Sequence, residues 1–275
     1  MNLMNNYIPR EYLALKINYC RQQLASLPDI RLAEHNIAGT PTKIVFSDNH
    51  RYRTDSEPGS NLYQIWKQRD QLERELRIYE AIWYAYFKGE PPEDCEPHKA
   101  NRVIYVDTNK PVIMNKDYFD SLKNDADTTY AKPDNYKFNG IKYRSAAEKE
   151  IAIFYTEMGI PFKYEPEIFI KGMVKPIHPD FVLYLRELDT CKIHEHLGMR
   201  DYADYIKNTK IKLSNFIGAG LVQDLDVLFT HSTDGTYFDP RHLSAKLNGA
   251  IYGTICMNKP KPFSLQSDSQ QEPAS

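Results

Sequence analysis

The chain has 275 residues, of which 41% are hydrophobic, so it can bury a sizeable core. Charged residues make up 26%, and 35 Lys and Arg stand against 37 Asp and Glu, which gives a formal net charge of −2. No overall field therefore draws the chain to a polyanion, and any contact with a nucleic acid must come from a local patch. This composition excludes a disulfide-stapled miniprotein and a disordered tail.

The cysteines are far apart in the sequence, and no CxxC pair or Cys/His cluster is formed by Cys20, Cys95, Cys191 and Cys256. This pattern argues against structural zinc and against a disulfide framework. No apolar run approaches the roughly 20 residues that cross a bilayer, and residues 1–10 lack the order of a signal peptide. We therefore expect a cytoplasmic protein with reduced thiols and no membrane contact.

Residues 1–89 are predicted to form a helix–meander–helix module. Apolar residues spaced alternately by four and three predict a helix over residues 10–27, with a seam made by Leu13, Ile17, Cys20, Leu24 and Leu27. Turn residues and a β-branched run then predict an antiparallel meander over residues 30–53, and the helical period returns over residues 62–86. The two helices are expected to pair, and their seam leaves open a homodimer or a protein partner.

Residues 90–142 carry a weak pattern and are expected to be a connector with a little structure, namely a strand at 103–106 and a short helix at 118–123. The pattern is strong again over residues 143–257, where we predict a helix, three or four strands, a helix, a strand and a last helix. Their expected ranges are 145–158, 162–164, 167–170, 178–185, 192–196, 201–217, 225–230 and 240–251. This order predicts an α+β or α/β fold with a mixed sheet covered on both faces, followed by a disordered tail over residues 258–275.

Two acidic residues stand at predicted strand ends. Asp180 follows His178 and Pro179 at the start of one strand, and Glu195 closes the next. Neighbouring strands would bring both carboxylates to one rim of the sheet, where they can share a hard cation such as Mg²⁺. Ordinary strand-edge acids would show the same pattern. Phosphate-binding loops, dinucleotide fingerprints, zinc-protease motifs and nucleophile elbows are absent, which disfavours those enzyme classes.

A third acid, Glu148, begins a predicted helix in the segment Ser145-Ala146-Ala147-Glu148. Ser at the N-cap with Glu three residues later is a capping box, which needs no function. A functional role for Glu148 requires that the first turn of this helix lie against the acidic strand ends.

These segments together resemble the nuclease domain of the PD-(D/E)xK superfamily, especially bacterial and phage members with an E-H-x-G segment. The resemblance covers roughly residues 143–230 and lies in Ser145-x-x-Glu148, Gly159-Ile160-Pro161 with Tyr164-Glu165, Pro179-Asp180-Phe181, and Glu195-His196-x-Gly198-Met199. It implies a restriction-endonuclease-like αβββαβ core and Mg²⁺ or Mn²⁺ held by Asp180, Glu195 and Glu148. It also implies hydrolysis of phosphodiester bonds, with DNA as the expected substrate.

One position departs from this pattern, because Leu197 stands where the superfamily has its lysine. Relatives with the E-H-x-G segment place a lysine on the following helix, which corresponds to Lys212. Helical geometry also lets Lys210 reach toward the rim from the other flank of the helix. The implied catalytic set is therefore completed by Lys212, with Lys210 as the open alternative.

Basic residues on the predicted meander, Lys43, Arg51 and Arg53, are where we expect contact with DNA, and His178 is placed to contact a phosphate. A charged edge strand guarded against aggregation would look similar. The sequence thus favours a Mg²⁺-dependent endodeoxyribonuclease. The alternative is a catalytically inactive nuclease-fold protein that acts as a DNA- or protein-binding module.

Overall fold

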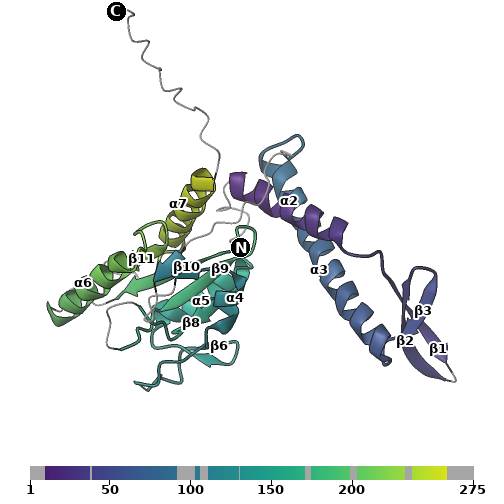
Figure 1. The fold of residues 1–275 in the computed structure, drawn as a ribbon, viewed down its shortest axis with the longest axis horizontal. Coiled ribbons are helices and arrows are strands. Elements are labelled where there is room, and N and C mark those ends of the chain that lie inside the picture. The colour runs from purple at the N-terminus through teal and green to yellow at the C-terminus, as the bar shows by residue number, and fades with distance from the viewer. Residues whose placement is uncertain are drawn as a thin grey trace, which may run out of the picture.

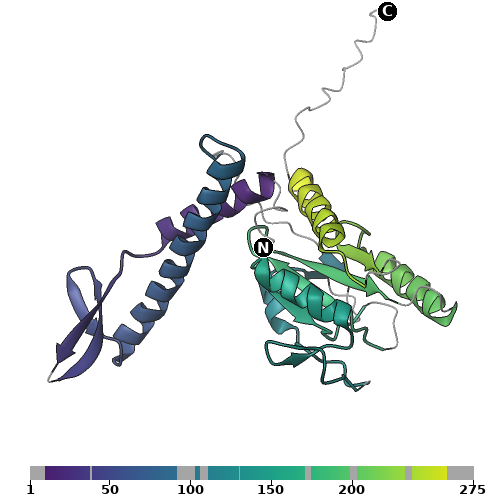
Figure 2. The ribbon, with the colours of Figure 1, turned by 180° about the vertical axis from the view of Figure 1, so that it is seen from behind.

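The structure is a computed structural model that describes residues 10–37, 39–91, 103–105, 111–129, 131–170, 175–198, 203–232 and 237–258. It consists of a long arm built by the N-terminal third and a core built around a four-stranded sheet (Figures 1 and 2). None of the described helices has the length and apolar character that a membrane span requires.

The arm has the predicted helix–meander–helix order. Helices α2 (Arg10–Ser26) and α3 (Glu57–Tyr86) pack together, and the antiparallel strands β1 (Arg31–Ile37), β2 (Thr40–Ser47) and β3 (His50–Arg53) lie at the end away from the core (Figure 1). Helix α3 begins before the predicted residue 62, because the Ser56 side chain caps it by accepting a hydrogen bond from the Gly59 amide at 3.3 Å.

The apolar seam of α2 is buried inside the chain. Its residues Leu13, Ile17 and Cys20 are fully buried in a cluster with Leu72, Tyr79 and Trp83 of α3. Arg69, which interrupts the apolar stripe of α3, donates hydrogen bonds to the carbonyls of Leu24 and Leu27 at 3.3 and 3.4 Å. These carbonyls lie at the end of α2, where helical partners run out. The seam that left a homodimer open therefore needs no second copy to cover it.

The connector forms two small hairpins and a short helix. The elements are β4 (Val103–Tyr105), β5 (Pro111–Ile113), α4 (Lys116–Ser121), β6 (Lys137–Phe138) and β7 (Ile141–Lys142). The β6–β7 hairpin turns at Asn139 and Gly140, whose φ angles of 47° and 80° suit the Asn-Gly turn. The sequence pattern does not predict this hairpin, because a strand of two residues shows no periodicity.

In the core, the elements follow in the order expected from the sequence. They are α5 (Ala146–Glu157), β8 (Phe162–Tyr164), β9 (Phe181–Leu185), β10 (Thr190–Leu197), α6 (Ala203–Gly218), β11 (Val227–His231) and α7 (Pro240–Asn258). The strand order is β11-β10-β9-β8, in which β10 and β11 run parallel and the other neighbours run antiparallel. The predicted mixed sheet is confirmed.

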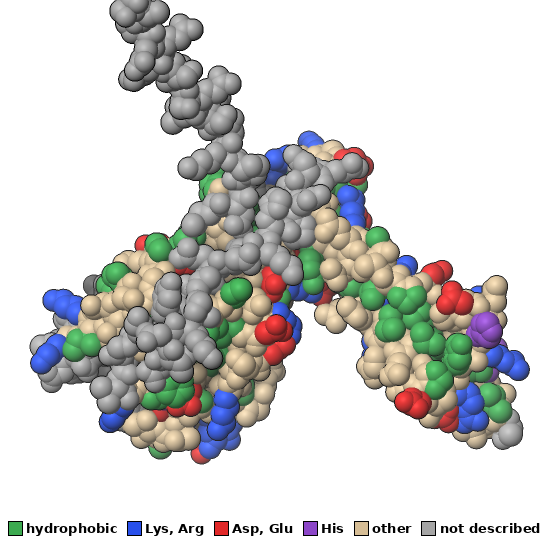
Figure 3. Space-filling model, in the orientation of Figure 1, with side chains coloured by type: hydrophobic (Ala, Val, Ile, Leu, Met, Phe, Trp, Pro, Cys, Tyr) green, Lys and Arg blue, Asp and Glu red, His purple; other side chains and the backbone are tan. Residues whose placement is uncertain are grey.

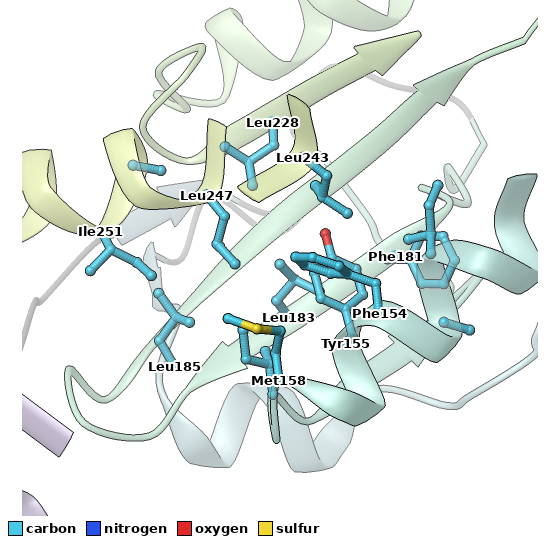
Figure 4. Packing of buried hydrophobic residues seen from close by; sticks show 14 of the residues in the cluster. Phe154, Tyr155, Met158, Phe181, Leu183, Leu185, Leu228, Leu243, Leu247 and Ile251 are labelled. Carbon is cyan, nitrogen blue, oxygen red and sulfur yellow. The ribbon is translucent and has the colours of Figure 1, made fainter. Parts of the chain in front are cut away.

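Helices cover both faces of this sheet, as predicted. On one face, α5 and α7 bury a cluster in which Phe154 and Tyr155 meet Leu183 and Leu247 (Figure 4). On the other face, α4 and α6 contribute a second cluster built from Phe119, Phe216, Val182, Ile193 and their neighbours. Because successive strand residues point to opposite faces, β9 and β11 each supply residues to both clusters.

Some predicted boundaries are wrong. The predicted strand at 167–170 is reduced to an isolated bridge between Ile168 and Ile177. The strand predicted from residue 178 begins at Phe181, because Pro179 has no amide hydrogen for the ladder. Helix α7 continues past residue 251 to Asn258, and residues 259–275 of the predicted tail lie outside the described part.

Buried charges join the arm to the core. Glu187, in the turn between β9 and β10, accepts hydrogen bonds from Lys16 Nζ at 2.9 Å and from the Tyr12 hydroxyl at 3.3 Å. Arg186 forms an ion pair with Glu75 of α3. Helix α2 is thus packed against the core through groups that the sequence shows only as a helix lysine and a charged turn.

Candidate active site

The strand register brings Asp180 and Glu195 together. Phe181 of β9 pairs with His194 of β10, so continuing the antiparallel ladder by one residue sets Asp180 opposite Glu195. The Asp180 carboxylate also accepts a hydrogen bond from the backbone amide of His196, with Oδ2 at 2.6 Å from the nitrogen. The predicted meeting of these two acids at the sheet rim is present in the structure.

Both acids lie on the α6 side of the sheet. Val182, two residues after Asp180, and Ile193, two residues before Glu195, belong to the hydrophobic cluster beneath α6. Residues two apart on a strand share a face, so the two carboxylates face the same helix.

Lys212 of α6 meets Glu195. Its Nζ lies 2.6 Å from both carboxylate oxygens of Glu195 and 3.4 Å from the carbonyl oxygen of His178. Lys210, the alternative, is exposed on the same helix. His178 is half-buried and contributes its backbone carbonyl to this contact. The lysine expected from the helix is therefore the one that reaches the acidic pair.

Glu195 is almost fully buried, with an exposed fraction of 4%. Burial raises the pKa of this carboxyl to about 8; Lys212 acts in the opposite direction, and the charge of Asp180 adds to the rise. The Lys212 ammonium contacts both carboxylate oxygens, Oε1 and Oε2, at 2.6 Å. Burial therefore outweighs the Lys212 charge in setting the proton affinity of Glu195.

Glu148 serves both as a capping residue and as a neighbour of the acidic pair. Its amide donates to Ser145 Oγ at 3.2 Å, as a capping box requires. Its carboxylate accepts three hydrogen bonds, from Ser145 Oγ at 3.1 Å, the Arg144 amide at 3.1 Å and the Tyr164 hydroxyl at 2.6 Å. Burial, followed by the charge of Asp180, raises the pKa of Glu148 to about 7.

A network of ion pairs that sequence analysis missed lies next to Glu148. Glu165 is buried and pairs with Arg144, whose Nε lies 2.8 Å from Oε1, and with Lys132. Arg144 also pairs with Asp127, and Lys132 Nζ lies 4.4 Å from the ring centroid of Tyr164. Glu165 has a φ of 41°, a left-handed conformation that neither its residue type nor its spacing signals.

The histidines beside Glu195 lie on the opposite face and form a continuous hydrogen-bonded chain. His194 contacts the Tyr155 hydroxyl at 2.8 Å and Thr230 Oγ1 at 2.7 Å. The same Thr230 oxygen contacts His196 at 2.8 Å, and His196 contacts Ser232 at 3.3 Å. Burial lowers the pKa of His194 to about 3. His196 is thus buried and hydrogen-bonded through both ring nitrogens.

Within the described residues, no group of three His, Cys, Asp or Glu side chains is close enough to hold a metal ion. The predicted ligands Asp180, Glu195 and Glu148 therefore do not converge as a set of three. Mg²⁺ is usually held by one or two carboxylates, with water or phosphate oxygens completing its octahedron. Asp180 and Glu195 supply this smaller donor set, because they are two carboxylates on neighbouring strands that face the same side of the sheet.

The residues predicted to contact DNA do not form one patch. Arg53 and Arg51 of β3 pair with Ile44 and Phe46 of β2, so the arginine side chains share the face of those two residues. Lys43 is next to Ile44 on β2 and therefore points to the opposite face of the meander. Arg53 is paired with Asp55 at 2.6 Å, and Lys43 stands across the ladder from Glu34. Asp55 thus offsets the charge of Arg53, whereas Lys43 and Glu34 face each other on the ladder without forming an ion pair among the described residues.

Comparison with known proteins adds no relative. No protein-family model, no curated protein and no solved structure matches the chain. The resemblance to the PD-(D/E)xK superfamily accordingly rests on the sequence motifs alone.

Proposed function

We propose that the chain is a metal-dependent nuclease of the PD-(D/E)xK type that hydrolyses phosphodiester bonds in DNA. The observation that carries this proposal is the contact between Lys212 and Glu195 at 2.6 Å, beside Asp180. In this proposal Lys212, on helix α6, takes the role of the superfamily lysine, whose usual position is occupied here by Leu197. The succession from α5 to β11 in a mixed sheet supports a restriction-endonuclease-like core.

In this proposal Asp180 and Glu195 would hold Mg²⁺ or Mn²⁺. Such a cation, when bound, polarises a phosphoryl oxygen and lowers the pKa of a bound water. The backbone amide of His196 orients the Asp180 carboxylate by its hydrogen bond to Oδ2. Lys212, which is partly exposed, orients Glu195 and places a positive charge where negative charge develops on phosphate.

Glu148 is the group suited to accept a proton near neutral pH, because its pKa is raised to about 7. Its three hydrogen bonds fix the carboxylate beside Asp180 without making it a member of a three-ligand group. We propose that residues 143–257 contain the cutting site and that the arm, within residues 1–89, positions the nucleic acid.

The same contact also supports a second candidate. Because Lys212 lies 2.6 Å from both oxygens of Glu195, the pair can be a structural ion pair in an inactive nuclease-fold protein that binds DNA or protein. The two candidates differ in metal dependence. A divalent cation should stabilise the nuclease through Asp180 and Glu195 and should leave the inactive protein unchanged.

Nicking of a supercoiled plasmid in Mg²⁺ tests the first candidate. Asp180→Asn and Glu195→Gln should abolish nicking, whereas Glu157→Gln, an exposed acid at the far end of α5, should retain it. Equal activity of all variants and wild type would remove the proposal. In parallel, Mg²⁺ should raise the Tm of wild type and not that of Asp180→Asn; a Tm indifferent to the metal in both favours the second candidate.

A further inference from the structure

Two lysines from different elements converge on one aromatic ring of the arm. Lys43 Nζ of β2 lies 5.9 Å from the ring centroid of Tyr63, and Lys67 Nζ of α3 lies 4.5 Å from it. The ring of Tyr63 is stacked on that of Trp66, with centroids 5.8 Å apart and planes 6° from parallel. We call these four residues, Lys43, Tyr63, Trp66 and Lys67, the arm platform.

The positive charge of the arm platform is not neutralised by ion pairs. Both lysines are exposed, and among the described residues neither has a carboxylate within 4.0 Å. Lys67 donates a hydrogen bond to the neutral side chain of Gln64, at 3.4 Å. Two ammonium groups near one ring make the local potential positive, which favours binding of an anion at this surface.

Besides its positive charge, the arm platform offers an aromatic surface. Tyr63 and Trp66 are half-buried, so part of each ring remains at the surface. Figure 3 shows hydrophobic side chains gathered where the meander meets α3, on the face of the arm that it presents. A ligand that complements the arm platform therefore carries both negative charge and a flat apolar face.

We propose that the arm platform binds single-stranded nucleic acid. Phosphates would contact Lys43 and Lys67, and an unpaired base would stack against the surface of the Tyr63 and Trp66 pair. A duplex keeps its bases inside, and an acidic peptide offers charge without a stacking plane, so a single strand matches both features at once. This site goes beyond the proposed nuclease function, because binding on the arm needs neither Asp180 nor Glu195.

Fluorescence anisotropy with a labelled oligothymidylate of about 16 nucleotides tests the proposal in the full chain, in EDTA so that cutting plays no part. The variant carries Lys43→Gln with Lys67→Gln. Its matched control carries Lys137→Gln with Lys142→Gln, which removes the same charge from the exposed β6–β7 hairpin. We expect the Kd to rise about tenfold in the first and to stay near wild type in the second.

Salt dependence and tryptophan fluorescence add two independent readouts. Each lost phosphate contact makes the negative slope of log K against log salt shallower by about 0.7. The slope of the Lys43→Gln, Lys67→Gln variant should therefore be shallower than that of wild type by about 1.4. The chain has two tryptophans, and Trp83 is 1% exposed. Quenching on binding should therefore come from Trp66 and disappear in Trp66→Phe.

Several results would overturn the inference. These are oligothymidylate binding that both double variants retain equally, quenching that survives Trp66→Phe, or no binding by wild type. A duplex or an oligoglutamate peptide that binds more tightly than the single strand would also overturn it. Because the assay contains no metal, its failure leaves the nicking result untouched, and a failure of nicking leaves this assay readable.

Discussion

Lys16 Nζ lies 2.9 Å from Glu187 Oε1, and both side chains are 1% exposed. This ion pair joins the first helix of the arm to the turn between β9 and β10, the two strands that bring Asp180 and Glu195 together. Both charged groups are shielded from water, which carries a large desolvation cost. Their mutual attraction and the hydrogen bond from the Tyr12 hydroxyl to Glu187 offset that cost. The pair specifies how the arm meets the core more than it adds net stability.

Breaking this pair should be costly. Glu187→Gln leaves the Lys16 ammonium buried beside a neutral amide, and we expect it to lower the free energy of unfolding by about 3–5 kcal/mol. Urea denaturation measures the change. Lys16→Met combined with Glu187→Leu removes both charges and should cost less than Glu187→Gln alone. A loss below about 1 kcal/mol in Glu187→Gln would contradict the buried pair.

The same carboxyl predicts how stability responds to acid. Although burial acts to raise it, the charges of Lys16 and Arg186 bring the pKa of Glu187 from 4.5 to about 2. The folded state therefore binds fewer protons than the unfolded state between these values. Stability from Glu187 is complete above about pH 4.5 and is lost as the pH falls toward 2. Denaturation at several pH values should show this loss in wild type and a flatter profile in Glu187→Gln.

The sequence predicted the parts of this protein that depend on local periodicity. The stripe of Leu13, Ile17 and Cys20 specifies α2 because burial recurs with the helical period. Asp180 and Glu195 could be predicted to lie opposite each other, because they stand on two adjacent strands that are joined by one charged turn. The alternation of side chains along a strand then determines which face each carboxylate occupies.

The remaining features depend on contacts between distant segments. Lys16 has the sequence context of an ordinary polar position on a helix, yet it is buried because Glu187, far along the chain, faces it. The hydrogen bond from Tyr164 to Glu148 and the left-handed backbone of Glu165 likewise arise only when β8 is packed beside α5. No period or motif within a single segment contains that information.

Without metal, the acidic site should lose stability as the pH rises. The pKa of Glu195 moves from 4.5 to about 8, so the folded state binds more protons than the unfolded state over this window. Its contribution is present below about pH 4.5 and is lost as the pH approaches 8. Thermal melts in EDTA should show the decline, with a smaller one in Glu195→Gln. Mg²⁺ should reduce it in wild type, because a cation stabilises the charged carboxylate. A slope equal in wild type and Glu195→Gln would count against the raised pKa.

Lys212 and Lys210 of α6 provide a matched pair for activity. Lys212→Met removes the ammonium 2.6 Å from Glu195, and we expect plasmid nicking to fall by about 10²-fold or more. Lys210→Met removes the same group from an exposed position two residues away and should nick like wild type. Circular dichroism of both variants checks the fold. Equal loss in the two would mean that general charge, and not the Glu195 contact, supports activity.

Tyr164 should set the proton affinity of Glu148. Its hydroxyl donates to Glu148 Oε2 at 2.6 Å and favours the charged carboxylate, so Tyr164→Phe should raise the pKa of Glu148 above about 7. If Glu148 works as a base, the acid limb of the nicking rate must move to higher pH.

Tyr143→Phe is the control. The ring centroids of Tyr143 and Tyr164 are 4.6 Å apart, but the buried Tyr143 hydroxyl has no hydrogen-bond partner among the described residues. That variant should keep the wild-type pH profile. Identical profiles in all three proteins would show that the proton on Glu148 does not limit cutting.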